Sequence, residues 1–124
     1  MNNGIKFKIF ELHSFVQRTY SDMKIACDIA IYQENTSKYL ISLGFLNKSY
    51  MTYIETKRFY RENKELVSVE FDNFFDTYDI LEQELKKVIS TEDKNPSLLH
   101  SRFDQFQQKV KNINDLIKVM QNAR

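Results

Sequence analysis

Apolar side chains recur at alternating steps of four and three residues in two stretches of the C-terminal half. The first stripe lies within residues 67–90 and the second within residues 98–121: Val67, Phe71, Phe74, Tyr78, Leu81, Leu85 and Val88, then Leu99, Phe103, Phe106, Val110, Ile113, Ile117 and Met120. Steps of four and three place side chains on one face of an α-helix. Each stretch therefore predicts an amphipathic helix of roughly 25 residues, about 37 Å long.

A short polar segment, residues 91–97 (TEDKNPS), separates these two predicted helices. Asn95 is a good helix N-cap, and Pro96 suits the first helical position because an N–H there would have no partner. The residue before a proline is also biased away from the helical conformation, so the preceding helix is expected to end by that point. Two apolar stripes joined by one short loop predict an antiparallel helical hairpin.

The N-terminal half has the same helical periodicity with a wider apolar face. A helix over residues 5–33 is predicted by a central stripe with further apolar residues beside it: Ile5, Ile9, Leu12, Val16, Met23, Ala26 and Ala30, flanked by Phe7, Phe10, Phe15, Ile25, Ile29 and Ile31. A wide apolar face is typical of a helix that packs on two sides. Because breaks are indicated near residues 33–40 and 44–49, residues 37–46 form either a short helix or a continuation of the first. A long helix over 49–90 and a C-terminal helix over 96–122 are expected to follow.

The chain contains only two glycines and one proline. This number is too small for the many turns of an all-β or α/β protein. We therefore predict an all-α fold, an up-and-down helical bundle of three long helices, with or without a fourth short one. Its C-terminal half is the antiparallel helical hairpin, and residues 1–124 are expected to form a single domain.

Charge is segregated along the hairpin, although the formal net charge of the chain is only +1. Residues 66–93 carry eight acidic side chains and two lysines, whereas residues 94–124 carry six basic and two acidic side chains. An acidic helix that folds back on a basic one is expected to form ion pairs along its flanks, each contributing about 0–1 kcal/mol at a surface.

The single cysteine, Cys27, excludes an internal disulfide and is typical of a reducing compartment. It is expected to pack in the core, where cysteine behaves as a small apolar residue. The sequence shows no signal-peptide pattern and no apolar run long enough to span a bilayer. The chain is therefore expected to be soluble and cytoplasmic, with no membrane span.

Side chains that serve as acids, bases or metal ligands in enzymes favour structural roles in this sequence. Asp72, Asp76 and Asp79 share a helix face nearly opposite the apolar stripe, which is typical of a solvated surface. His13 and His100 lie far apart along the chain, and no metal-ligand spacing includes them. We therefore predict no catalytic residue, no metal, no cofactor and no enzymatic activity.

Residues 37–64 interleave aromatic side chains with basic ones. Tyrosine is favoured at protein interfaces. Aromatic side chains that alternate with lysine and arginine also suit nucleic-acid binding, so both interpretations stay open. The residues expected to bind a protein partner are Tyr50, Tyr53, Phe59 and Tyr60, with Leu66, Val69 and Ile80 as secondary candidates. The residues expected to bind nucleic acid in the alternative are Lys57, Arg58, Arg61 and Lys64.

The secondary candidates lie off the apolar stripe, so they meet either the N-terminal helices or another chain. The favoured function is a non-enzymatic helical protein–protein interaction module of an adaptor, chaperone, immunity or secretion-accessory type. Its expected partner is another protein, a second copy of the same chain in a homodimer, or both. The alternative is a small nucleic-acid-binding protein that uses residues 38–64.

Overall fold

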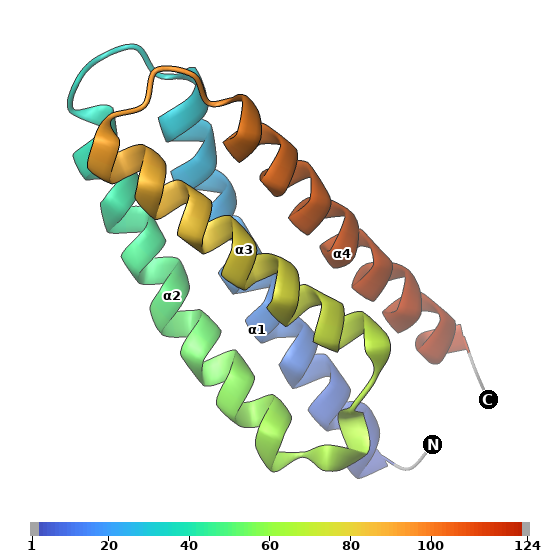
Figure 1. Cartoon of the computed structure of the whole chain (residues 1–124). Coiled ribbons are helices and arrows are strands. Elements are labelled where there is room, and N and C mark those ends of the chain that lie inside the picture. Colours follow the sequence, from blue (N-terminus) through green and yellow to red (C-terminus); the bar gives the residue numbers. More distant parts are fainter. Residues whose placement is uncertain (1–2, 123–124) are drawn as a thin grey trace.

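The computed structural model describes residues 3–122, which form four α-helices in an up-and-down bundle (Figure 1). The helices are α1 (Asn3–Tyr32), α2 (Lys38–Glu62), α3 (Val69–Thr91) and α4 (Ser97–Asn122), and a short 3₁₀ turn, η1 (Lys64–Leu66), lies between α2 and α3. The described residues contain no strand. The all-α bundle and its C-terminal antiparallel hairpin, α3–α4, are confirmed.

The helices divide the chain differently from the predicted boundaries. Residues 37–46 form neither a short helix nor a continuation of α1, because they fall at the start of α2, which runs unbroken through Gly44. The helix expected over residues 49–90 is interrupted at residues 63–68. The bundle therefore has four long helices rather than three.

The interruption between α2 and α3 uses side-chain hydrogen bonds instead of glycine or proline. Asn63 Nδ2 donates to the carbonyl of Phe59 at 2.8 Å, next to the last turn of α2. Ser68 has an extended backbone and caps α3, since its hydroxyl accepts from the N–H of Phe71. Leu66 is buried between these two caps and attaches the turn to the core. The chain reverses here, so α3 runs antiparallel to α2.

The predicted hydrogen bond of Asn95 at the start of α4 is present, although α4 begins at Ser97 rather than at Pro96. The predicted ion pairs between α3 and α4 are not found among residues 3–122. Asn95 Oδ1 accepts from the N–H of Ser97 at 3.3 Å, beside Pro96. Within residues 3–122, no basic group of α4 lies within 4.0 Å of a carboxylate of α3. The hairpin is held by its two apolar stripes: Phe71, Phe74, Tyr78, Leu81, Leu85 and Val88 are buried with Leu99, Phe103, Phe106, Val110, Ile113 and Ile117.

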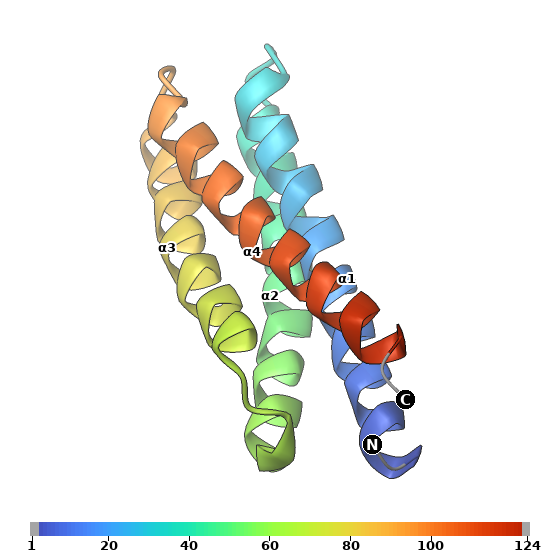
Figure 2. The same ribbon diagram turned by 90° about the vertical axis from the view of Figure 1, so that its right-hand side faces the viewer.

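Helix α4 is tilted across the bundle, as Figure 2 shows. Near the α3–α4 loop it runs beside α3, and toward its other end it crosses α1. At that crossing, the His13 ring and the Gln17 amide of α1 both contact Asn114 Oδ1 of α4. The tilt separates the C-terminal half of α1 from the start of α4, and a cleft lies between them.

Candidate interaction surface

Three of the residues predicted to bind a partner are buried inside the bundle. Tyr53, Tyr60 and Leu66 are 2%, 7% and 5% exposed, so they offer no free surface for another protein. The two tyrosine rings fill the space between α2 and α3, where they contact Phe75 at 5.7 and 5.1 Å between ring centroids. The prediction is corrected at these three positions, because their side chains hold the bundle together.

The buried tyrosines belong to a seven-residue repeat that faces α3, which we call the tyrosine seam: Tyr39, Leu46, Tyr53 and Tyr60. The Tyr53 hydroxyl lies 2.7 Å from Asp79 Oδ1 and 3.2 Å from the carbonyl of Phe75. The Tyr60 hydroxyl accepts from the N–H of Ser68 at 3.0 Å and lies 2.8 Å from Asp72 Oδ1. The seam thus combines buried rings with hydroxyl groups that reach polar partners at its edge.

The carboxylates of α3 are more than a solvated face. Asp72 and Asp79 receive the hydroxyls of Tyr60 and Tyr53, and only Asp76 of the three is without a hydrogen bond to α2 among the described residues. Burial, together with the neighbouring Asp72, raises the pKa of Tyr60 to about 12. Burial and the bond to Asp79 raise the pKa of Tyr53 as well. Both hydroxyls therefore remain protonated donors at neutral pH.

A second repeat on α2 faces α1, and we call it the hydroxyl seam: Ser42, Ser49 and Thr56. All three residues are fully buried. Ser42 Oγ donates to the carbonyl of Ala26, and Ser49 Oγ to that of Thr19, each at 2.8 Å. Because these side chains are small, the backbones of α1 and α2 can lie close together along this seam.

Sequence reasoning missed both seams, although a signal for them is present. Together they repeat at steps of three and four: Tyr39, Ser42, Leu46, Ser49, Tyr53, Thr56 and Tyr60. Serine and threonine are usually exposed, so the pattern does not register as an apolar stripe. Counting hydroxyl residues as core positions would have revealed the inward face of α2.

The remaining predicted partner residues lie on three separate surfaces. Tyr50 is 40% exposed on α2, beside the Lys86 ammonium of α3. Phe59 is partly buried against Phe15 of α1, with 5.6 Å between ring centroids. Val69 is exposed on α3 and lines a cleft with Leu116 and Val119 of α4, whereas Ile80 is exposed on α3 beside polar residues. Tyr50 borders a larger group of exposed apolar side chains on α2.

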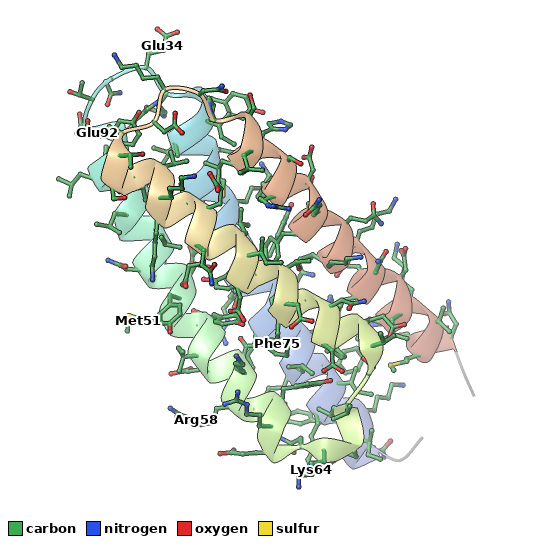
Figure 3. All side chains as sticks on the ribbon, in the orientation of Figure 1. Glu34, Met51, Arg58, Lys64, Phe75 and Glu92 are labelled. Atoms are coloured by element: carbon green, nitrogen blue, oxygen red, sulfur yellow. The ribbon has the colours of Figure 1, made fainter. Side chains whose placement is uncertain are left out.

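That group lies on the outer face of α2, which we define by Leu40, Leu43, Gly44, Asn47, Tyr50, Met51 and Ile54. At the edge of this face, Leu43 packs against the core and the Tyr50 ring lies 6.1 Å from that of Tyr53. Leu40 and Met51 are 75% and 72% exposed, and Ile54 is 38% exposed. Figure 3 shows Met51 pointing out of the bundle, in contrast to Phe75, which lies between α2 and α3. Steps of three and four relate Leu40, Leu43, Asn47, Tyr50 and Ile54, so these positions follow one side of the helix.

The basic residues of the nucleic-acid alternative continue from this face toward the end of α2. Within residues 3–122, no carboxylate lies within 4.0 Å of the cationic groups of Lys57, Arg58, Arg61 or Lys64. Lys57 and Arg61 nevertheless line a cleft of about 410 Å³ together with three aspartates of α3: Asp72, Asp76 and Asp79. Those aspartates disfavour a phosphate backbone, and the buried tyrosines are not available to stack on bases.

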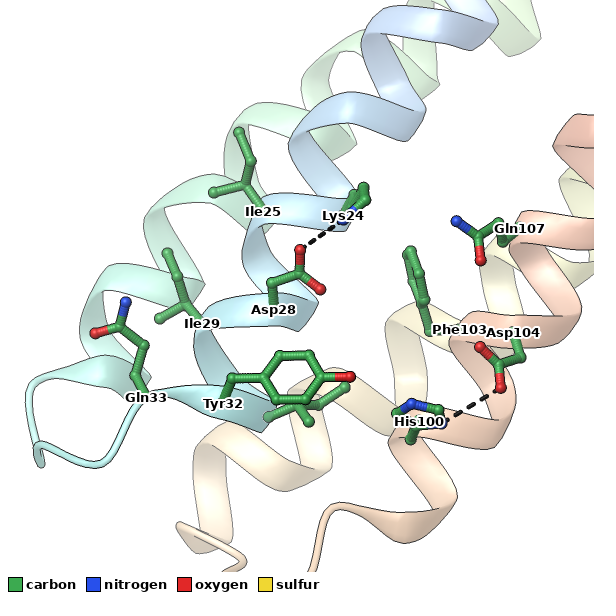
Figure 4. Close-up of a pocket in the computed structure, with 11 residues that line it drawn as sticks. Lys24, Ile25, Asp28, Ile29, Tyr32, Gln33, His100, Phe103, Asp104 and Gln107 are labelled. Atoms are coloured by element: carbon green, nitrogen blue, oxygen red, sulfur yellow. Dashed lines mark hydrogen bonds and ion pairs between the residues drawn. The ribbon is translucent and has the colours of Figure 1, made fainter.

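The cleft between α1 and α4 has a volume of about 570 Å³ and is lined by both apolar and polar side chains (Figure 4). Lys24 pairs with Asp28 at 2.7 Å on α1, and His100 Nδ1 lies 3.3 Å from Asp104 Oδ2 on α4. Hydrogen bonding to Asp28 raises the pKa of Lys24. Each pair joins residues four apart on one helix, an arrangement common on helix surfaces, and neither pair spans the cleft.

The other polar groups do not assemble into a reactive site among the described residues. Cys27 is buried, and burial raises the pKa of its thiol, so the reactive thiolate is disfavoured. Within residues 3–122, no three His, Cys, Asp or Glu side chains are grouped where they could hold a metal ion. No helix in this range has the length and apolar character that crossing a membrane requires.

Comparison of the chain with protein-family models, with curated proteins and with solved structures finds no match.

Proposed function

We propose that this chain is a helical protein–protein interaction module that binds its partner through the outer face of α2. The observation that carries the proposal is the row of exposed apolar side chains from Leu40 to Ile54, on the side of α2 away from the core. An exposed apolar group of this kind is typical of an interaction site. The proposal keeps Tyr50 from the predicted partner residues and replaces the buried tyrosines with Leu40, Met51 and Ile54.

The energetic argument rests on how much apolar surface a partner would remove from water. Burying a large aliphatic side chain contributes roughly 1.5–3 kcal/mol. Leu40 and Met51 are the most exposed of the apolar side chains on this face, so they stand to gain the most. Neither forms part of the core cluster, which leaves them free to act in binding without affecting the fold.

Site-specific photo-crosslinking in the native host tests the proposal. A photoreactive phenylalanine analogue at position 51 is expected to capture a protein, whether another protein or a second copy of this chain. The same analogue at Ile80, an exposed apolar position on α3, is the matched control and should capture little. Equal capture from both positions, or none from position 51, would contradict the proposal.

A binding measurement then tests the face itself. The double variant Leu40→Glu, Met51→Glu is expected to bind the captured protein at least tenfold more weakly, a loss of about 1.4 kcal/mol or more. Ile80→Glu should bind as the unmodified chain does. Isothermal titration calorimetry gives the affinities, and circular dichroism verifies that all three proteins are equally helical.

Nucleic-acid binding is the alternative. The observation that supports it is the group of basic side chains near the end of α2 that have no ion-pair partner among the described residues. It predicts an affinity that falls steeply as salt is raised, because released counterions drive such binding. Charge reversal at Arg58 and Arg61 should abolish it, whereas Leu40→Glu with Met51→Glu should leave it nearly unchanged. Fluorescence anisotropy with a labelled oligonucleotide distinguishes these patterns from the protein-binding pattern.

A further inference from the structure

We infer that the occupant of the outer face of α2 is the same face of a second copy, antiparallel to the first, with the two-fold axis beside Asn47. The inference rests on the proposed function, since it names the partner of that face. In a two-fold dimer the same residues come from both chains, so residue i meets residue j and j meets i. The outer face of α2 satisfies this condition about position 47.

The apolar positions are symmetric about Asn47. Leu40 and Ile54 lie seven residues on either side of it, so an antiparallel copy places each against the other. Seven residues are two helical turns, so both side chains project from the same side of α2 as Asn47. Both are exposed in the single chain, and their pairing would bury apolar surface from each copy.

Gly44 and Tyr50 form the next symmetric pair, at three residues on either side. Glycine within a helix is less stable than alanine by about 0.5–1 kcal/mol. A Cβ atom added at Gly44 would meet nothing within 4 Å, so the packing of a single chain gives no reason for glycine there. An antiparallel neighbour does give one, because its Tyr50 ring lies over the bare backbone at Gly44. Leu43 and Met51, four residues either side of Asn47, match in the same way.

Two charges near the ends of α2, Glu34 and Arg58, are placed to pair with each other in the antiparallel direction, although Lys38 and Lys94 lie beside Glu34 and Glu62 lies beside Arg58. Figure 3 shows Glu34 and Glu92 at one end of the bundle and Arg58 and Lys64 toward the other, with Met51 between them. Within residues 3–122, none of these four ionic side chains has an ion-pair partner. Glu34 precedes Asn47 by 13 residues and Arg58 follows it by 11, so a copy turned end over end places its Glu34 near Arg58 of the first. A parallel copy would place like charges together.

Asn47 lies where the two chains meet. Its amide has both donor and acceptor groups, so two copies related by a two-fold axis can hydrogen-bond to each other. A single asparagine within an apolar helix contact is also a known means of fixing the register between two helices. The side chain is exposed and makes no hydrogen bond within the described part of the chain.

The first experiment measures the mass of the purified full chain by size-exclusion chromatography with light scattering. At about 100 µM, where a dimer with a low-micromolar Kd is largely formed, the mass should be twice the 14.9 kDa of one chain. Gly44→Leu should produce a monomer with equal or greater thermal stability, since leucine favours helix but fills the space for Tyr50. Arg58→Glu should weaken the dimer about tenfold, and adding Glu34→Arg should restore it.

Cysteine crosslinking in a Cys27→Ala background tests the direction and register. Asn47→Cys is expected to form a disulfide-linked dimer with itself, because the axis brings the two positions together. Leu40→Cys and Ile54→Cys chains should crosslink when mixed but not alone. Ile80→Cys on α3 is the control that should stay monomeric. Crosslinking of Leu40→Cys with itself would show a parallel contact and overturn the proposed arrangement.

The outcomes separate this inference from the proposed function. A monomer at about 100 µM would overturn the proposed dimer. A dimer that persists in both the Gly44→Leu variant and the Leu40→Glu, Met51→Glu variant would overturn it too, because that dimer would not use the outer face of α2. Capture of a different protein alone by the photoreactive group at position 51 also overturns it, yet supports the proposed function. No capture at that position contradicts both.

Discussion

Helix α2 packs against its two neighbours with opposite kinds of side chain. Toward α1 it presents the hydroxyl seam, whose serines and threonine meet small residues of α1 such as Thr19 and Ala26. Toward α3 it presents the tyrosine seam, whose rings meet Phe71, Phe75 and Tyr78. Both seams repeat every seven residues. The same helix therefore presents small side chains to α1 and large ones to α3 at the same spacing.

The difference shows that burial on α2 is achieved in two ways. In the hydroxyl seam the backbones are close, and the buried hydroxyls donate to helix carbonyls, as Ser42 does to Ala26. In the tyrosine seam the rings bridge a wider space, and stacking of Tyr53 on Tyr78 with 3.9 Å between centroids replaces backbone proximity. The first seam should therefore tolerate no added volume, and the second should tolerate no loss of volume.

The largest expected effect comes from emptying the tyrosine seam. Tyr53→Ala should lower the free energy of unfolding by about 3–5 kcal/mol, because it leaves a cavity between α2 and α3. Tyr53→Phe keeps the ring and loses the bond to Asp79, so it should cost only about 1 kcal/mol. Urea unfolding followed by circular dichroism measures both. A Tyr53→Ala protein as stable as the unmodified chain would show that the ring does not fill the core.

Filling the hydroxyl seam is the reciprocal change and the second largest effect. Ser42→Leu should destabilise the protein by about 1–3 kcal/mol, since the side chain is fully buried against the backbone of Ala26. Ser42→Ala removes the hydroxyl without adding volume and should stay within about 0.5 kcal/mol of the original, because the carbonyl of Ala26 already belongs to a helix. If both variants are equally unstable, the hydrogen bond matters more than the spacing of the helices.

The inner faces of the helices differ in how well they could be predicted from the sequence. The hairpin α3–α4 was predicted because apolar side chains mark its inner faces without a gap, from Phe71 to Val88 and from Leu99 to Ile117. The inner face of α2 was not predicted, because half of it is serine and threonine, which are polar in any count of hydrophobicity. Tyr53 and Tyr60 were consequently assigned to the surface.

The turn at residues 63–68 escaped prediction for a related reason. No helix end was predicted here, and the segment contains neither glycine nor proline. The turn is made by the side chains of Asn63 and Ser68 and by the burial of Leu66. Conversely, Gly44 suggested a helix end and lies within α2. The outer face of α2 was only partly anticipated through Tyr50, because nothing local to Leu40 or Met51 indicates which side of the helix the core will cover.

The hydroxyl of Tyr60 should have an intermediate effect, confined to the end of the tyrosine seam. Tyr60→Phe removes the acceptor for the N–H of Ser68 and the donor to Asp72, so we expect a loss of about 1–2 kcal/mol. Tyr50→Phe is the matched control. The Tyr50 hydroxyl has no hydrogen bond within the described residues, so its loss should change the free energy of unfolding very little. Thermal unfolding of both variants, by calorimetry, gives the comparison.

The smallest expected effect concerns Glu82, an acid of α3 on the α2-facing side. Its Oε2 atom is buried without a hydrogen-bond partner among residues 3–122, while Oε1 lies 3.5 Å from the Lys86 ammonium. Burial raises the pKa of Glu82 above its ordinary value of 4.5, with Asp79 adding to the rise and Lys86 opposing it. The folded state therefore holds this proton more tightly than the unfolded state does.

The consequence for stability follows from that difference. Below the ordinary pKa, Glu82 is neutral in both states, and its contribution to stability is fully present; it is lost as pH rises through the raised pKa of the folded state. Glu82→Gln stays neutral throughout. The free energy of unfolding of Glu82→Gln, relative to the unmodified chain, should therefore increase by less than about 1 kcal/mol from about pH 4 to pH 7. A difference that is constant with pH would contradict the prediction, because it would mean that water or Lys86 fully compensates the charge of Glu82 in the folded state.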